Sequence, residues 1–121
     1  MTLHVNPNNS AGDSFVIKGQ DSQEVDQVHL TTIDKLVDEL KLDRIDFIKM
    51  DIEGAPDRAL TGAKQTLLRY KPRLAISTEE DNDDPGRIIN IIDDLHLGYR
   101  RQCGQCALRG YSVFPEVLFF Y

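Results

Sequence analysis

The 121-residue sequence has no tryptophan, only 2 cysteines, and fewer basic than acidic residues, with 14 Lys and Arg against 20 Asp and Glu. Two cysteines are too few for a disulfide scaffold, so stability must come from the burial of apolar side chains. The formal net charge of −6 argues against polyanionic partners, because nucleic acids and anionic membrane surfaces are bound mainly through Lys and Arg. We therefore expect neither a nucleic-acid partner nor a membrane partner.

Long apolar runs are also missing from the sequence. No segment approaches the roughly 18 apolar residues of a membrane-spanning helix, and Met1 to Phe15 lacks the basic start and apolar run of a signal peptide. We expect a cytoplasmic protein. With 40% hydrophobic and 28% charged residues, the chain is too apolar for wholesale disorder and has the size of one compact domain, residues 1–121.

Short β-rich runs alternate with helical runs, which is typical of an α/β fold. Strands are expected at Thr2 to Val5, Val25 to Leu30, Ile45 to Ile52 and Leu74 to Thr78. The nearly unbroken apolar run of Ile45 to Ile52 predicts a central strand that is covered on both faces. Two final strands, joined by a loop as an antiparallel pair at one sheet edge, are expected at Tyr99 to Gln102 and Val113 to Tyr121.

Three segments have the apolar spacing of a helix that buries one face. The first has Thr31 or Thr32 as its N-cap and a stripe of Ile33, Leu36, Val37 and Leu40. The second begins near Pro56, ends before Pro72, and has a stripe of Ala59, Leu60, Ala63, Leu67 and Leu68. The third is capped by Asp84, stops at Gly98, and has a stripe of Ile88, Ile91, Ile92 and Leu95.

The most informative motif is Lys49-Met50-Asp51-Ile52-Glu53-Gly54, because ionisable residues stand at the end of an otherwise apolar strand. In open α/β sheets, ligands bind at the carboxyl ends of the strands. Alternation along the strand places Lys49, Asp51 and Glu53 on one side, where they form a cluster suited to proton transfer or cation binding. The alternative is structural: a carboxylate caps the following turn and the lysine neutralises the charge.

An acidic run, Glu79 to Asp84, follows the next expected strand. Glu79 lies nearest to that strand and is the best candidate there for binding a substrate. The template of a calcium-binding loop starting at Asp81 fails, because Pro85 occupies a ligand position and Ile92 stands where the bidentate glutamate is needed. A solvated loop is therefore the alternative, and no metal site is predicted.

Cys103 and Cys106 have the two-residue spacing of redox and zinc motifs. A redox motif of this kind opens a helix near the start of its fold, and a structural zinc site needs four ligands, whereas only 3 histidines remain as imidazole donors. We expect two incidental thiols in a loop.

Several motifs occur in the order in which one known family has them. They are Thr32 to Leu36, Ile45 to Ala55 with the pattern Lys-x-Asp-x-Glu-Gly, Ala59 to Ala63, and Pro72 to Ser77. On these residues the chain resembles the FkbM family of S-adenosylmethionine-dependent methyltransferases, from about Val28 to Tyr121. One departure is Pro56, followed by Asp57, where that family commonly has a glutamate.

The resemblance implies the second half of a Rossmann-like methyltransferase fold, with the first half absent. In that family S-adenosylmethionine is held mainly by a glycine-rich turn after the first strand and by an acidic residue that ends the second. None of the 8 glycines here forms such a group after a strand. No residue of this chain is therefore assigned to cofactor binding.

The resemblance also implies that Asp51 and Glu53, with Lys49, lie at the cofactor and acceptor edge and orient an acceptor hydroxyl or accept its proton. The implied reaction is in-line methyl transfer to an oxygen of a small-molecule or glycan acceptor. Because half of the donor site is missing, the isolated chain is expected to have weak or no activity.

The alternative is a non-catalytic, degenerate α/β module that acts in oligomerisation or partner binding. Without the first half of the fold, the strand at Ile45 to Ile52 exposes one edge, and an uncovered apolar edge tends to pair with another chain. This predicts a homodimer formed through that sheet edge.

Overall fold

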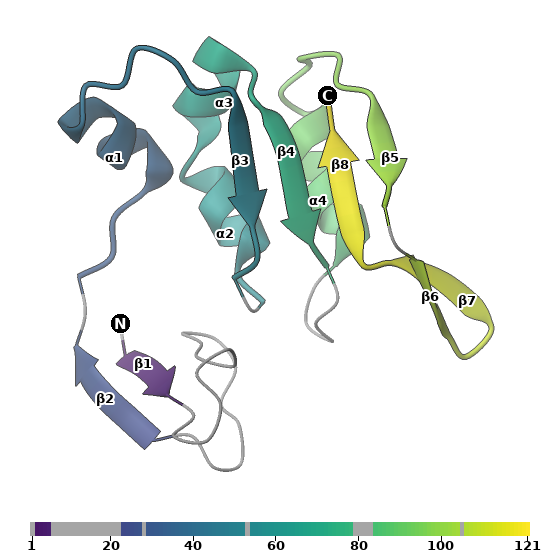
Figure 1. Ribbon diagram of the computed structural model, residues 1–121. Helices are drawn as coiled ribbons and strands as arrows, with labels where there is room; N and C mark the ends of the chain where they lie inside the picture. Colours follow the sequence, from purple (N-terminus) through teal and green to yellow (C-terminus); the bar gives the residue numbers. More distant parts are fainter. Residues whose placement is uncertain (1, 6–22, 28, 53, 79–83, 105) are drawn as a thin grey trace.

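The structure is a computed structural model that describes residues 2–5, 23–27, 29–52, 54–78, 84–104 and 106–121. Helices and strands alternate through most of it (Figure 1), which confirms the α/β class. The strands are β1 Thr2–Val5, β2 Gln23–Gln27, β3 Phe47–Met50, β4 Arg73–Ser77, β5 Arg101–Cys103, β6 Cys106–Arg109, β7 Ser112–Pro115 and β8 Val117–Phe120. The helices are α1 Ile33–Glu39, α2 Pro56–Thr61, α3 Lys64–Tyr70 and α4 Pro85–Asp93.

The main sheet has four strands in the order β3-β4-β8-β5. β3 and β4 run parallel, whereas β8 runs antiparallel to both β4 and β5. The pairing of β5 with β8 at one edge confirms the predicted antiparallel pair. β1 and β2 form a separate antiparallel pair, in which β1 has its predicted bounds and β2 ends at Gln27 rather than Leu30.

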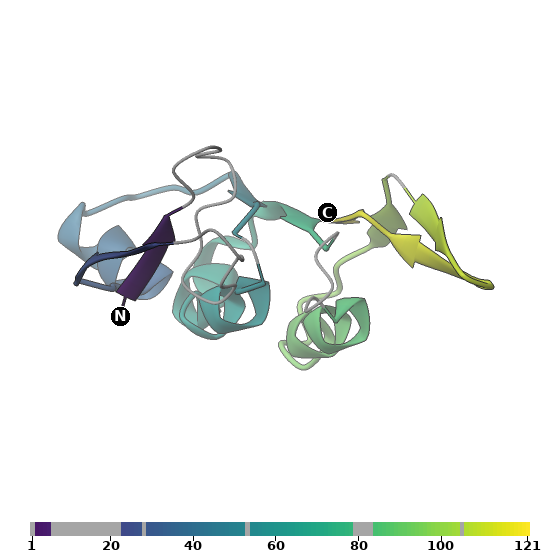
Figure 2. The same cartoon turned by 90° about the horizontal axis from the view of Figure 1, so that it is seen from below.

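One face of the main sheet is covered by α2, α3 and α4 (Figure 2). The core lies in this interface and includes Met50, Leu60, Ala63, Leu67, Leu74, Ile76, Ile88, Ile92, Leu118 and Phe120. On the other face, Phe47, Phe119 and Tyr121 remain 54%, 37% and 48% exposed. We call this second surface the open face of the sheet.

The expectation that both faces of β3 are covered is wrong, whereas the exposed edge expected for this strand is seen among the described residues. Among the described residues β3 is an edge strand of the four-stranded sheet, and its Phe47 lies on the open face. The physical reason is that an unbroken apolar run indicates buried side chains. It does not show which strands pair beside the strand or what covers the second face of the sheet.

The second predicted helix is two helices, α2 and α3, separated at Gly62 and Ala63. At this break the Gly62 carbonyl accepts a hydrogen bond of 2.9 Å from the Asp34 N–H, so a tertiary contact replaces helix continuation. Leu60 and Leu67 are buried as predicted, whereas Leu68 is 43% exposed and does not belong to the buried stripe. Helix α3 ends at Lys71, which has a left-handed backbone, immediately before Pro72.

The predicted N-caps of the other two helices are confirmed. The Thr32 hydroxyl accepts a hydrogen bond of 3.2 Å from the Lys35 N–H, and Asp84 Oδ1 accepts one of 3.1 Å from the Arg87 N–H. The predicted apolar faces are only partly covered, because Val37 is buried in α1 whereas Leu36 and Leu40 are exposed. Ile88 and Ile92 of α4 are buried as expected, and α4 ends at Asp93, before the predicted stop.

The loop predicted between the last two strands contains a second hairpin, β6–β7, which projects away from the main sheet (Figure 1). The predicted strand Val113 to Tyr121 is consequently split into β7 and β8, with Glu116 between them. The expectation of free thiols is wrong, because Cys103 and Cys106 form a disulfide where β5 passes into β6. The two-residue spacing permits such a bond, but the sequence does not report whether the fold brings the two thiols together.

Candidate functional site

The ionisable pair at the end of β3 has the predicted placement. Lys49 Nζ donates a hydrogen bond of 2.8 Å to Asp51 Oδ2, and the two side chains are 66% and 48% exposed. An ion pair this exposed contributes at most about 1 kcal/mol to folding. Because both side chains are exposed, the pair is accessible to a ligand. Because its contribution is small, the stability of the fold does not depend on it.

Glu53 and Glu79, the other two predicted site residues, lie outside the described residues. The structure thus brings together two members of the predicted cluster, Lys49 and Asp51. The participation of Glu53 and of Glu79 stays a prediction of the sequence.

A cleft adjoins this end of β3 and lies between the start of α1 and the start of α2. It has a volume of about 440 Å³, which is within the usual range for small-molecule sites. Its lining consists of Leu30, Thr31, Thr32, Ile33, Lys35, Ile52, Ala55, Arg58, Ala59 and Gly62. The walls are mainly aliphatic, and the cationic side chains of Lys35 and Arg58 are exposed. The cleft therefore suits a ligand with a flat or apolar body.

Sequence reasoning missed this cleft, because its two walls come from separate segments, residues 30–35 and 52–62. One signal was present in the sequence: the apolar residue Ile52 directly follows Asp51 at the strand end. In the structure its side chain is 41% exposed rather than buried. An apolar residue at the carboxyl end of a strand in an α/β sheet is positioned to contact a ligand.

Asp34 lies in α1, between two residues that line one wall of the cleft, and was not predicted as a functional residue. Its Oδ1 accepts hydrogen bonds from the Thr66 N–H at 2.8 Å and the Thr66 hydroxyl at 2.7 Å, and its Oδ2 accepts one from the Gln65 N–H at 3.0 Å. Burial acts to raise the pKa of Asp34, and the hydrogen bonds from Thr66 and Gln65 outweigh it, so the net pKa lies below its usual value. Asp34 is a positioning residue, because it ties α1 to α3 and thereby holds one wall of the cleft.

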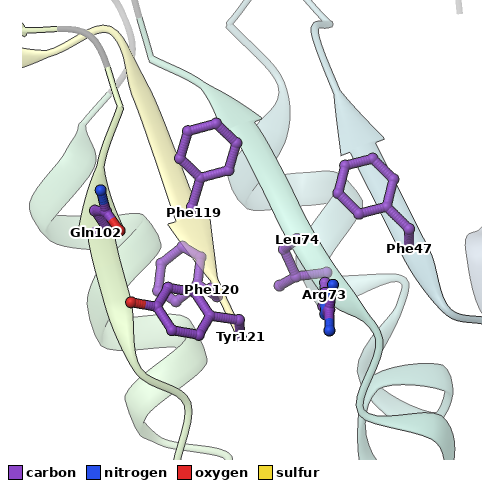
Figure 3. A pocket seen from close by; sticks show the side chains of 7 residues that line it. All are labelled: Phe47, Arg73, Leu74, Gln102, Phe119, Phe120 and Tyr121. Carbon is purple, nitrogen blue, oxygen red and sulfur yellow. The ribbon is translucent and has the colours of Figure 1, made fainter.

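The open face carries a second hollow, of about 510 Å³, shown in Figure 3. Phe47, Arg73, Gln102, Phe119 and Tyr121 are among its lining residues. Phe47 and Arg73 begin β3 and β4, so this hollow lies at the amino ends of the parallel strands. It is thus at the opposite end of β3 from Asp51 and does not belong to the candidate site.

Two negative findings apply to the described part of the chain. There, no group of three or more His, Cys, Asp or Glu side chains is placed to hold a metal ion. No helix among those residues is long and apolar enough to cross a bilayer. The cytoplasmic location stays a prediction of the sequence.

The fold is of the α/β class, and its parallel strand pair has a charged carboxyl end with a cleft next to it, which is where open α/β sheets place their ligand sites. The family described as the methyltransferase FkbM domain matches residues 2–101, so the chain belongs to that family. This confirms the resemblance found in the sequence.

A solved structure gives independent support for the family. The crystal structure of methyltransferase FkbM from Methylobacillus flagellatus KT matches with a TM-score of 0.56 and 28% sequence identity, over 99% of this chain and 25% of that one. The present chain therefore spans about a quarter of the length of that solved chain. No curated protein matches the sequence.

Proposed function

We propose that this chain is part of an S-adenosylmethionine-dependent methyltransferase that transfers a methyl group to an oxygen acceptor. One observation carries the proposal: the Lys49–Asp51 pair stands at the carboxyl end of a parallel strand, and the next residue, Ile52, lines an apolar cleft, in a chain of the FkbM family. On this proposal residues 1–121 are a single, partial domain and form the second half of a Rossmann-like fold.

The cleft fits one part of the donor. S-adenosylmethionine supplies an electrophilic methyl group on a sulfonium, and it also carries a flat adenine ring. Ile33, Ile52 and Ala59 provide apolar walls of the kind that bind such a ring. A glycine-rich turn for close approach of the backbone to the donor is not found among the glycines of this sequence. The chain would thus supply one wall of the donor site.

Asp51 is the residue that we assign to the acceptor. A hydroxyl that is being methylated loses its proton, and a carboxylate within hydrogen-bonding distance can orient that hydroxyl and accept the proton. The hydrogen bond from Lys49 Nζ to Asp51 Oδ2 fixes one oxygen of this carboxylate and leaves Oδ1 for the acceptor. We include Glu53 as a second carboxylate at this edge and Glu79 as an acceptor-binding residue, and we expect a small-molecule or glycan hydroxyl as the acceptor.

A non-catalytic module for oligomerisation or partner binding is the second candidate. The exposed edge of β3 and the apolar open face support it, because both are surfaces that other polypeptides cover. The family match favours the methyltransferase.

The donor site is tested by calorimetric titration of the purified chain with S-adenosylmethionine and with its demethylated product. We compare Ile52→Asp, in the cleft, with Leu68→Asp on the outer side of α3, because the two side chains are 41% and 43% exposed. We expect binding to the wild type and to Leu68→Asp, and at least a tenfold loss in Ile52→Asp. Binding that is equal in both variants would contradict the assignment of the cleft, and no binding to the folded wild type would place the donor site outside this chain.

The role of the carboxylates is tested in a full-length relative that carries the Lys-x-Asp-x-Glu-Gly motif. The double variant Asp51→Asn, Glu53→Gln at the matching positions removes both proton acceptors while keeping the shape of the side chains. We expect methyl transfer to fall by a factor of about 100 or more, which is typical for the loss of a general base. Unchanged transfer would remove both residues from the mechanism. A separate measurement on the isolated 121-residue chain tests the expectation that it is weak or inactive alone, which rapid turnover would refute.

A further inference from the structure

The β6–β7 hairpin begins at the end of the main sheet where the candidate site lies. Strand β5 runs parallel to β3 and β4, because β8 is antiparallel to both β4 and β5. The strands β3 and β5 therefore end on the same side of the sheet, with Asp51 after β3 and Gly104 after β5 (Figure 1). We call this side the carboxyl end of the sheet. Because β3 and β5 are the outermost strands of the described sheet, whatever pairs beside β3 lies away from the hairpin.

The hairpin has few contacts beyond its own two strands. β6 and β7 form a two-stranded sheet of their own. Leu108 and Val113, which lie opposite each other in it, are 77% and 68% exposed. An isolated two-stranded hairpin is marginally stable in water, and segments with little buried apolar surface open at a low cost in free energy. The position of the hairpin therefore depends on how its base is fastened to the main sheet.

The base of the hairpin is fastened on both of its strands. On the β7 side, the Thr78 hydroxyl donates a hydrogen bond of 2.6 Å to the Pro115 carbonyl, and the Thr78 N–H donates one of 2.8 Å to the Glu116 carbonyl. On the β6 side, the disulfide between Cys103 and Cys106 joins the end of β5 to the start of β6. The disulfide differs from the hydrogen bonds in that a thiol can open it and an oxidant can close it again.

We propose that Cys103 and Cys106 form a reversible thiol–disulfide exchange site, whose redox state decides whether the β6–β7 hairpin is held at the carboxyl end of the sheet. Cys106 is exposed and Cys103 is half-buried, so a thiol from solution reaches the bond at Cys106. The sequence predicts a cytoplasmic protein, and disulfides in that compartment are usually transient, with a catalytic or redox-sensing role.

The effect of the disulfide is local. It joins residues with a sequence separation of only 3, and a cross-link that closes a short loop restricts the unfolded chain less than one that closes a long loop. The core of the main sheet includes neither cysteine. Reduction should therefore release the hairpin and leave the main sheet folded.

The exchange reaction needs a dithiol as the reductant. One thiolate of the dithiol attacks Cys106 Sγ, the bond between the two protein sulfurs breaks, and the Cys103 thiolate leaves and takes up a proton from water. The second thiolate of the dithiol then displaces Cys106, which is also protonated, and the reductant becomes a cyclic disulfide. The protein pair gains two electrons and two protons, and the dithiol loses them. Oxidised glutathione reverses the change and leaves as two molecules of reduced glutathione.

The consequence for the candidate site rests on the proposed function. On that proposal the carboxyl end of the sheet receives the acceptor, so release of the hairpin would alter the entrance on the β5 side. Proteolysis measures the hairpin directly and involves no methyl transfer. A negative result would therefore leave the proposed function standing, and a failure of the proposed function would leave the exchange site standing.

Limited digestion of the 121-residue chain with trypsin tests the release of the hairpin. Cleavage after Arg109, where β6 ends, requires the hairpin to open, so its rate follows the population of the open form. We expect this cleavage to be at least tenfold faster after treatment with dithiothreitol than in the oxidised chain. Oxidised glutathione should restore the slow rate. Arg69 in α3 is the internal control, and cleavage there should not change.

The double variant Cys103→Ser, Cys106→Ser is the matched control for the chemistry, because these are the 2 cysteines of the sequence. It should be cleaved after Arg109 as fast as the reduced wild type, with or without dithiothreitol. Alkylation of the thiols followed by mass measurement gives the redox state of the wild type in each digestion.

Three results would overturn the proposal. If dithiothreitol reduces the pair only after denaturation, the disulfide is not accessible in the folded protein. If cleavage after Arg109 is equally fast in both redox states, the disulfide does not hold the hairpin. If reduction accelerates cleavage after Arg69 as much as after Arg109, the disulfide stabilises the whole fold and not the hairpin alone.

Discussion

Replacing Asp34 by Asn changes one oxygen into an NH₂ group in a site built from three donors. Asp34 Oδ1 accepts two hydrogen bonds from Thr66, and Oδ2 accepts one from the Gln65 N–H. The amide has a single acceptor oxygen, so its NH₂ group must face either the two Thr66 donors or the Gln65 N–H. The lower-energy choice keeps the bonds to Thr66 and leaves two donors facing each other at Gln65.

The magnitude follows from the bonds that are lost. A hydrogen bond to a charged group contributes about 1.5–3 kcal/mol, and a neutral one about 1 kcal/mol. Asp34→Asn loses one charged bond and weakens two. Because these bonds are exposed or only partly buried, the low end of each range applies, and we expect the free energy of unfolding to fall by about 2–3 kcal/mol. Asp34→Ala also leaves the Thr66 side chain, which is 2% exposed, without its acceptor, and it should cost about 1 kcal/mol more. At roughly 4 °C per kcal/mol for this chain length, the melting temperature falls by about 8–12 °C in Asp34→Asn.

The assay is urea unfolding of the wild type and Asp34→Asn between pH 2 and pH 7. Because the pKa of Asp34 is lowered in the folded state, its contribution to stability is complete above the ordinary pKa of about 3.9 and is lost as the pH falls through the lowered value. The difference in unfolding free energy between the two proteins should therefore be constant at neutral pH and shrink below about pH 4. Asp38→Asn, at an exposed position of the same helix, is the control and should show a difference below about 0.5 kcal/mol.

Two results would refute this reasoning. A change below about 0.5 kcal/mol in Asp34→Asn would mean that the three hydrogen bonds do not hold α1 against α3. A difference between the two proteins that grows at acid pH would mean that the pKa of Asp34 is raised in the folded state, so that burial outweighs the hydrogen bonds.

Three further predictions concern stability. The Tyr99 hydroxyl donates a hydrogen bond of 2.6 Å to the Pro72 carbonyl, and burial raises its pKa to about 12. Tyr99→Phe should lower the free energy of unfolding by about 1 kcal/mol. In urea titrations its difference from the wild type should shrink as the pH rises from about 10 to 12, because the phenol of the unfolded chain ionises first. A constant difference would contradict the raised pKa. Leu67→Ala should cost about 2–5 kcal/mol by thermal unfolding and Leu68→Ala less than 1, since they are 0% and 43% exposed. Equal costs would contradict the placement of Leu67 in the core and of Leu68 outside it. Thr32→Ala should cost about 1 kcal/mol through loss of the α1 cap, and Thr32→Ser should restore it; a similar loss in both would point to packing rather than capping.

Much of the fold could be predicted because the relevant signals are local. The spacing of Leu60, Ala63 and Leu67, for example, predicts that these side chains are buried, and all three are, although they lie on the two sides of the break between α2 and α3. Thr32 and Asp84 cap helices because their side chains bond backbone groups three residues away. The Lys49–Asp51 contact follows from strand alternation, which is also a local rule.

Other features required the tertiary structure. The helix that begins at Pro56 breaks at Gly62 because a carbonyl there bonds the Asp34 N–H, 28 residues earlier in the chain. The disulfide between Cys103 and Cys106 depends on how the fold places the end of β5 against the start of β6. The cleft that Ile52 lines exists because α1 and α2 are brought together after the end of β3. Asp34 could not be assigned a role from its sequence neighbours, since all its side-chain partners lie in α3.

The sequence by itself determined the α/β class, the FkbM family and the charged motif at the end of β3. These properties depend on residue type and spacing over a few turns or one strand. Only the tertiary structure decided that the second helix is divided into α2 and α3, that a β6–β7 hairpin lies between β5 and β8, and that a cleft is lined by Ile52 after the end of β3. The reason is physical: periodicity records which side chains are buried, whereas neighbours in a sheet and the walls of a cleft are set by contacts between segments that are distant in the chain.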